Sequence, residues 1–183
     1  MADVDLLSEL RAATRASHAA LDGRPLARAV LDGSIDPDGY RELIAWQLHA
    51  HAHAERGLTS VAWPAAFTYT SRQPALHAEH LAETTVPDGL ALAAPADLAE
   101  ATGRAYVLSG SALGGALILR HLEANESLRA FAPFPFYRFQ RERGLPEWRA
   151  FTAFAKTHPW TAAERATATR AALAVFEVFA KAD

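Results

Sequence analysis

The sequence has 183 residues, half of them hydrophobic, and a formal net charge of -3 at pH 7. This length and apolar content predict one domain, spanning residues 1–183, with a sizeable core. The small net charge, with both signs interspersed, argues against a nucleic-acid-binding surface. The absence of cysteine excludes disulfides, thiolate catalysis and cysteine-ligated zinc.

The first residues, MADVDLL, have neither the basic segment nor the apolar stretch of a signal peptide. No apolar run reaches the roughly 18 residues that a membrane-spanning helix needs. We therefore expect a cytoplasmic protein without a membrane span.

The spacing of apolar residues, together with helix-ending Gly and Pro, predicts seven helices. In chain order they cover residues 5–21, 26–31, 38–61, 74–84, 95–123, 145–157 and 161–181. The Pro-interrupted stretch FAPFPF, residues 131–136, is expected to be a connector. No segment alternates with a period of two for long enough to indicate a strand, so the predicted fold is an all-α bundle.

The first predicted helix contains LRAATRASHAALDG. At steps of three and four, one helix face carries Leu7, Arg11, Thr14, His18 and Leu21. Two helical turns, roughly 10.5 Å, separate the guanidinium from the imidazole, which suits a ligand with a central metal and a peripheral carboxylate. The alternative is a histidine satisfied by hydrogen bonds, with Arg11 exposed to solvent.

Three glycines interrupt a predicted helix in YVLSGSALGGALILR, although each costs about 1 kcal/mol relative to Ala in a helix interior. One face of this helix carries Tyr106, Gly110, Leu113, Gly114 and Leu117. Bare backbone on this face would let a flat ligand approach closely. Tight helix–helix packing through small residues explains the glycines equally well.

Other histidines cluster in LHAHAHAERG, where His49 and His53 are four residues apart, and in HAEH, which contains His77 and His80. The first pair could bind zinc if other ligands converged on it. The HExxH pattern is absent, so we expect these side chains to lie in solvent or on helix flanks. Phosphate-binding glycine loops and the GxSxG nucleophile motif are also absent.

Taken together, the His18 segment and the glycine segment resemble the heme oxygenase family. LRAATRASHAALDG is similar to the N-terminal helix in which a histidine ligates heme iron. YVLSGSALGG is similar to the distal helix, whose glycines lie over the heme face. The form YVL-x-GS-x-LGG especially resembles the bacterial heme oxygenases that are associated with bacteriophytochromes. Weaker similarity extends over nearly the whole chain.

The resemblance implies a role for each matching residue. His18 would be the iron ligand and Arg11 a propionate partner, while Gly110, Gly114 and Gly115 would contact the porphyrin. Phe176 matches an aromatic residue that lines the heme pocket, and Tyr106 and Arg149 are loosely aligned candidates for propionate contacts. Ser111 stands where many members have an Asp that orders pocket water, and with the Gly110 carbonyl it would position water for proton delivery.

The function implied by the resemblance is oxygen-dependent cleavage of heme to biliverdin, carbon monoxide and ferrous iron. Heme is then both substrate and cofactor. Because no flavin or iron–sulfur motif is present, electrons would come from an external ferredoxin, flavodoxin or reductase. A bacteriophytochrome would be a suitable acceptor of the biliverdin.

Two other functions are compatible with the same segments. A heme carrier or sensor would keep the pocket without turnover, and Ser111 in place of Asp favours it. The thiaminase-like branch shares a similar helical fold, but those enzymes generally use a cysteine nucleophile, which this chain lacks.

Overall fold

Helices account for the regular secondary structure of this computed structural model, which describes residues 5–64, 67–79 and 91–182. Within these residues there is no strand, and the chain forms one compact helical domain, which confirms the all-α prediction. The α-helices are α1 (Leu6–Asp22), α2 (Pro25–Asp32), α3 (Pro37–Ala54), α4 (Gln73–His77), α5 (Leu98–Ser111), α6 (Gly115–Ala124), α7 (Pro135–Thr157) and α8 (Ala162–Lys181). Three 3-10 helices are η1 (Leu58–Ser60), η2 (Ala112–Gly114) and η3 (Glu126–Phe131).

Side-chain caps determine where several helices begin, because the first backbone N–H groups of a helix lack partners inside it. Asp5, Asp36 and Asp97 accept hydrogen bonds of 2.8 Å from the backbone N–H of the third residue of α1, α3 and α5, respectively. Thr161 and Glu164 form a reciprocal capping box at the start of α8. The predicted starts of α1, α3 and α8 are therefore close to the observed ones.

The long helix predicted over residues 38–61 ends earlier, at Ala54. Gly57 follows with a φ of 78°, a left-handed conformation that glycine adopts without steric cost, and η1 replaces the last predicted turns. The helix predicted over residues 74–84 corresponds to α4, which is only five residues long. The part of that prediction from residue 80 onward, including His80, lies outside the described residues.

The connector predicted over residues 131–136 is only partly correct, because α7 already begins at Pro135, ten residues before the predicted helix. The buried carboxylate of Glu79 accepts a 2.8 Å hydrogen bond from the backbone N–H of Phe136 and so satisfies the start of α7. Pro135 is tolerated at the first helical position, where its missing N–H costs nothing. A cap from a residue 57 positions away leaves no local sequence signal.

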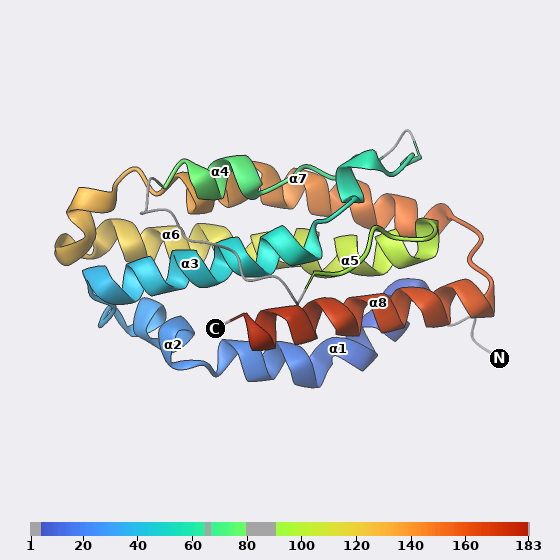
Figure 1. The fold of residues 1–183 in the computed structure, drawn as a ribbon, viewed down its shortest axis with the longest axis horizontal. Helices are drawn as coiled ribbons and strands as arrows, with labels where there is room; N and C mark the ends of the chain where they lie inside the picture. The colour runs from blue at the N-terminus through green and yellow to red at the C-terminus, as the bar shows by residue number, and fades with distance from the viewer. Residues whose placement is uncertain (1–4, 65–66, 80–90, 183) are drawn as a thin grey trace.

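The single helix predicted over residues 95–123 is broken into α5, η2 and α6. These three segments follow one another along the long axis of the molecule, and α7 packs against all three, while α8 packs against α5 and α2 packs against α6 (Figure 1). The helices come close enough to exclude a side chain: a Cβ added to Gly103 of α5 would lie 1.9 Å from the Ala168 carbonyl oxygen of α8. One of the two hydrophobic core clusters surrounds this contact, with Ala101, Ala105, Ala168 and Ala172 among its members.

Within the described residues, no helix is both long and apolar enough to cross a membrane.

Replacing Gly103 by Ala should strongly destabilise the fold, because the added methyl group has to push α5 and α8 apart. Overpacking of this kind lowers the free energy of unfolding by about 3 kcal/mol. Urea denaturation of Gly103→Ala against wild type measures the change. Gly114→Ala is the matched control, because a Cβ at Gly114 meets nothing within 4 Å. Equal stability of the two variants would contradict the close contact.

Candidate functional site

His18 lies near the end of α1 with its side chain 64% exposed, and its Nδ1 is 2.9 Å from a carboxylate oxygen of Asp22. Because an ionised carboxylate only accepts hydrogen bonds, Nδ1 of a neutral imidazole must carry the proton here. The lone pair is then on Nε2. Histidines that ligate a metal through one ring nitrogen commonly have such a hydrogen-bond partner on the other ring nitrogen.

The face of α1 that carries His18 lies at the edge of the core. The His18 ring contacts the ring of Phe176 on α8 with centroids 6.3 Å apart, and Phe176 is itself buried. Leu7 and Leu21 are half-buried against the same core cluster. Arg11, two turns before His18, is exposed. The structure thus brings His18 and Phe176 together and leaves the Arg11 side chain in solvent.

The glycines of the 106–115 segment have different surroundings. A Cβ at Gly115 would lie 2.5 Å from the Gln140 side chain of α7, so this glycine is explained by helix packing. A Cβ at Gly110 would lie 3.3 Å from the Trp148 ring, a tight contact. A Cβ at Gly114 meets nothing within 4 Å. Packing therefore accounts for Gly115 and partly for Gly110, but not for Gly114.

Gly114 belongs to an apolar surface that the protein leaves uncovered. Leu113 and Leu117, on the same helix face, are 45% and 47% exposed. Farther back on this face, Tyr106 is half-buried with its ring 5.7 Å from that of Trp148. Trp148 of α7 thus covers one half of the face, at Tyr106 and Gly110, and the other half faces solvent.

Two further predicted residues flank this face. Ser111 is exposed, and its hydroxyl donates a 2.9 Å hydrogen bond to the Leu108 carbonyl, which leaves the hydroxyl oxygen free to accept. Arg149 lies on α7 with an exposed side chain. Among the predicted residues, His18 therefore lies with Phe176, and Tyr106 lies with Gly110, while Ser111 and Gly114 are exposed beside the second pair. Trp148, which the sequence did not single out, packs against Tyr106 and Gly110.

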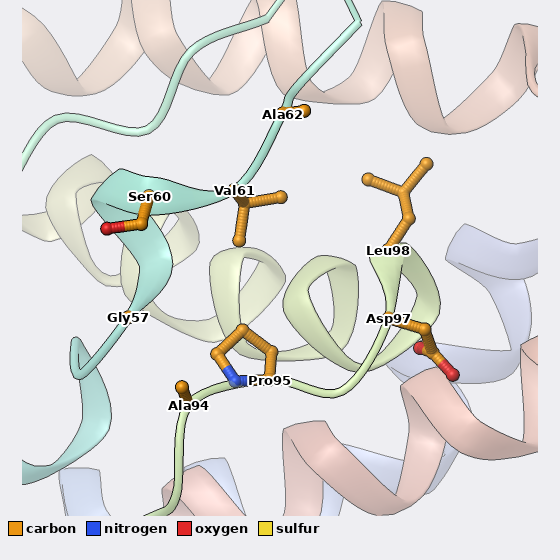
Figure 2. A pocket seen from close by; sticks show the side chains of 8 residues that line it. All are labelled: Gly57, Ser60, Val61, Ala62, Ala94, Pro95, Asp97 and Leu98. Atoms are coloured by element: carbon orange, nitrogen blue, oxygen red, sulfur yellow. The ribbon is translucent and has the colours of Figure 1, made fainter.

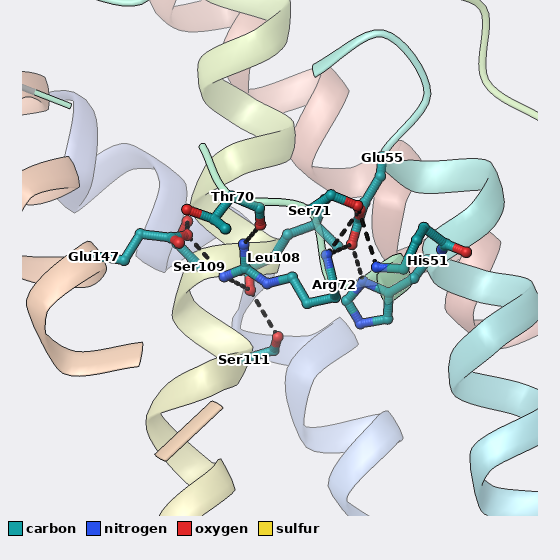
Figure 3. A network of polar contacts seen from close by, with 10 residues as sticks. His51, Glu55, Thr70, Ser71, Arg72, Leu108, Ser109, Ser111 and Glu147 are labelled. Carbon is teal, nitrogen blue, oxygen red and sulfur yellow. Dashed lines mark hydrogen bonds and ion pairs between the residues drawn. The ribbon is translucent and has the colours of Figure 1, made fainter. Parts of the chain in front are cut away.

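A buried polar network that the sequence did not predict lies behind the glycine segment (Figure 3). Its members come from the end of α3, from the segment before α4, from α5 and from α7. They are His51, Glu55, Thr70, Ser71, Arg72, Leu108, Ser109, Ser111 and Glu147. The expectation that the histidines of α3 lie in solvent or on helix flanks is wrong for His51 and His53, which are 0% and 4% exposed. The His51 side chain belongs to the interior because it contacts Glu55 and the rings of Phe136 and Phe179.

Glu55 collects hydrogen bonds from three residues of this network. One carboxylate oxygen is 2.8 Å from His51 Nδ1, and the other accepts from the Ser71 hydroxyl at 2.5 Å. The backbone N–H of Arg72 also donates to the carboxylate. Burial by itself would raise the pKa of Glu55, but the hydrogen bond and charge of His51, with the bonds from Ser71 and Arg72, outweigh it and lower that pKa below its usual value.

Arg72 is 1% exposed, and its positive charge is matched by Glu147 of α7, whose Oε1 is 2.7 Å from Arg72 Nη2. The same carboxylate oxygen accepts a 2.7 Å bond from the Ser109 hydroxyl. Arg72 also donates to the carbonyls of Thr70 and Leu108. Removing one partner from such a buried pair typically costs about 3–5 kcal/mol, because the other charge is left unpaired. Nothing in the local sequence SRQPA indicates that Arg72 has this role.

A cavity of about 440 Å³ lies between the end of α3 and the start of α5 (Figure 2). Its lining contains none of the predicted site residues: Gly57, Ser60, Val61, Ala62, Ala94, Pro95, Asp97 and Leu98. The Asp97 carboxylate already caps α5. The cavity therefore offers little polar chemistry.

In the part of the chain that the structure describes, no three metal-ligating side chains converge. The zinc site considered for His49 and His53 therefore finds no third protein ligand there. A single-histidine ligand to a metal that a porphyrin holds does not need such a cluster.

No protein-family profile matches the sequence, and no curated protein is significantly similar to it. The interpretation of the site therefore depends on its geometry and on the two motifs.

Gly114→Ala should raise the free energy of unfolding by about 0.4–1 kcal/mol, because its helical φ and ψ suit alanine and its Cβ would point into open space. Gly115→Ala should lower it instead, because the methyl group would meet Gln140. Chemical denaturation of both variants checks the opposite signs. A loss of stability in Gly114→Ala would show that the glycine has a packing role after all.

The lowered pKa of Glu55 makes stability depend on pH. A carboxylate whose pKa is depressed by folding stabilises the native state above its unfolded pKa, and this contribution is lost as the pH falls through the folded value. The difference in unfolding free energy between wild type and Glu55→Gln should be full at neutral pH and shrink below about pH 4.5. Urea titrations across this range measure it, and a difference that stays constant in acid would contradict the assignment.

Proposed function

We propose that this protein is a heme oxygenase, which cleaves heme to biliverdin, carbon monoxide and ferrous iron with oxygen and external electrons. The observation that carries the proposal is the uncovered apolar face of η2 and α6. Gly114 is bare backbone without a packing role, and Leu113 and Leu117 beside it are nearly half exposed. A flat apolar ligand that covers this face would explain all three.

His18 supports a porphyrin over other flat ligands. Its Nδ1–H points to Asp22, so Nε2 offers a lone pair that can ligate iron, and Phe176 supplies an aromatic contact beside it. A neutral imidazole is the ligand that oxygen-binding hemes use. Arg11 is exposed two turns away, at a distance suited to a propionate. Arg149 and Tyr106 are further candidates for propionate contacts.

When bound, heme would supply the oxygen chemistry, and the residues of the chain would direct it. The backbone of Gly114 would restrict the space on the distal side, and Trp148 would border it at Gly110. The Ser111 hydroxyl donates to the Leu108 carbonyl and can accept from a water molecule, which would then hold a proton near the distal face. The hydroxyl provides this position without the charge of a carboxylate.

Electrons for the reaction would come from an external ferredoxin, flavodoxin or reductase, and a bacteriophytochrome would be a suitable acceptor for biliverdin. A heme carrier or sensor is the second candidate, because Ser111 carries no charge to organise a proton pathway.

The test is reconstitution with hemin, followed by ascorbate or a ferredoxin–reductase system in air. The heme oxygenase proposal predicts that the Soret band decays while a biliverdin band appears and carbon monoxide is released. A complex that stays stable under these conditions would identify a carrier or sensor, and failure to bind hemin would overturn both.

His18→Ala should weaken heme binding at least about tenfold and change the absorption spectrum of the ferric complex, because it removes the iron ligand. His77→Ala is the matched control, since this histidine is also exposed on a helix. Both variants should keep the stability of wild type within about 0.5 kcal/mol. Asp22→Ala should weaken binding by roughly tenfold or more through loss of the partner on Nδ1. An unchanged heme spectrum in His18→Ala would contradict the ligand assignment.

A further inference from the structure

The backbone carbonyls at the end of α5 need hydrogen-bond donors from outside the helix. The last four carbonyls of an α-helix lack donors from the next turn, and in α5 these include the carbonyl of Leu108. Because η2 follows with a tighter winding, the chain cannot satisfy them as a continuous helix would. The Leu108 carbonyl instead accepts from the Ser111 hydroxyl at 2.9 Å and from Arg72 Nη2 at 3.3 Å.

Arg72 is itself held by α7. Its Nη2 is 2.7 Å from Glu147, and the same Glu147 oxygen accepts from Ser109, the residue that follows Leu108. Arg72 and Glu147 therefore hold two successive residues at the end of α5, one through its carbonyl and one through its hydroxyl. All these side chains except Ser111 are less than a tenth exposed, so water hardly competes for the bonds (Figure 3).

One turn of α7 faces this break in the helix. Gly144 lies so close that an added Cβ would be 2.8 Å from the Ala112 carbonyl oxygen, and Trp148 lies against Gly110. Glu147 sits between them on the same face of α7. The Arg72–Glu147 pair therefore lies where α7 contacts the break between α5 and η2. This contact determines the position of the backbone of residues 109–114.

We propose that the Arg72–Glu147 ion pair is a positioning device for the glycine segment, which sets how closely the backbone of Gly114 approaches a bound porphyrin. The inference rests on the proposed function. Arg72 and Glu147 do not touch the ligand: they act through the Leu108 carbonyl and the Ser109 hydroxyl.

Hydrogen–deuterium exchange of the ligand-free protein tests the positioning itself. In Glu147→Gln the oxygen that accepts from Ser109 is kept and the charge opposite Arg72 is lost. The amides of residues 109–116 should then exchange roughly tenfold faster, which corresponds to one weakened charge-assisted hydrogen bond. Arg72→Lys is a second variant with the same expected effect, because an ammonium cannot reach the acceptors that the guanidinium fork spans.

Arg104→Lys is the matched control. Arg104 is 2% exposed on α5 and pairs with Glu100 near the opposite end of this helix. It should leave exchange in residues 109–116 unchanged. If Glu147→Gln and Arg72→Lys behave like this control, the pair does not position the segment and the inference is overturned.

Spectroscopy of the heme complex tests the link to the ligand. Carbon monoxide bound to the reconstituted ferrous protein reports the closeness and polarity of the distal backbone through its C–O stretching frequency. We expect the C–O stretching frequency to shift in Glu147→Gln and to stay the same in Arg104→Lys. The absorption spectrum of the ferric complex, which reports ligation by His18, should be unchanged in both variants. If amide exchange is faster in Glu147→Gln but the C–O stretching frequency does not shift, the pair does not position the backbone toward the porphyrin. If the wild-type protein binds no heme, the proposed function itself is overturned.

Discussion

Close backbone approach around α5, η2 and α6 is the constraint on which the rest of the fold depends. Gly103 lets α8 contact α5 at Ala168, and Gly144 and Gly115 let α7 approach η2 and α6. At these positions even a methyl group would collide with a neighbouring helix, so the identity of the residue decides the spacing of the bundle. Helices that pack this closely bury polar groups of the backbone along with the apolar core, and those groups need partners.

The buried ion pair is a consequence of that constraint. At the break between α5 and η2, the Leu108 carbonyl accepts from the Ser111 hydroxyl and from Arg72, which lies outside the helix. A buried guanidinium requires a counter-charge, which Glu147 supplies from the turn of α7 that already lies against the break. The network therefore links the packing of α7 to the conformation of the glycine segment.

At the candidate site, backbone and apolar side chains are exposed that no neighbouring helix covers. The other glycines of α5 and α6, Gly103, Gly110 and Gly115, lie against neighbouring helices, but at Gly114 the backbone is bare and the flanking leucines are exposed. His18 offers an imidazole nitrogen beside the core aromatic Phe176. A porphyrin that bound both would cover apolar surface that is otherwise in contact with water, which is the physical basis of the proposed function.

Sequence patterns alone determined the all-α class and the approximate starts of α1, α3 and α8, because helix periodicity and capping are local properties. The resemblance to a known family, rather than these patterns, singled out His18 and the glycine segment. Sequence patterns could not decide which glycines serve packing: Gly114 and Gly115 are neighbours in the chain, yet only Gly115 meets another helix. Nor could they find Glu79 at the start of α7, the early end of α3, or the pairing of Arg72 with Glu147 across 75 residues. Only the tertiary structure decided these features, because each depends on which distant groups the packed helices bring within a few ångströms of one another.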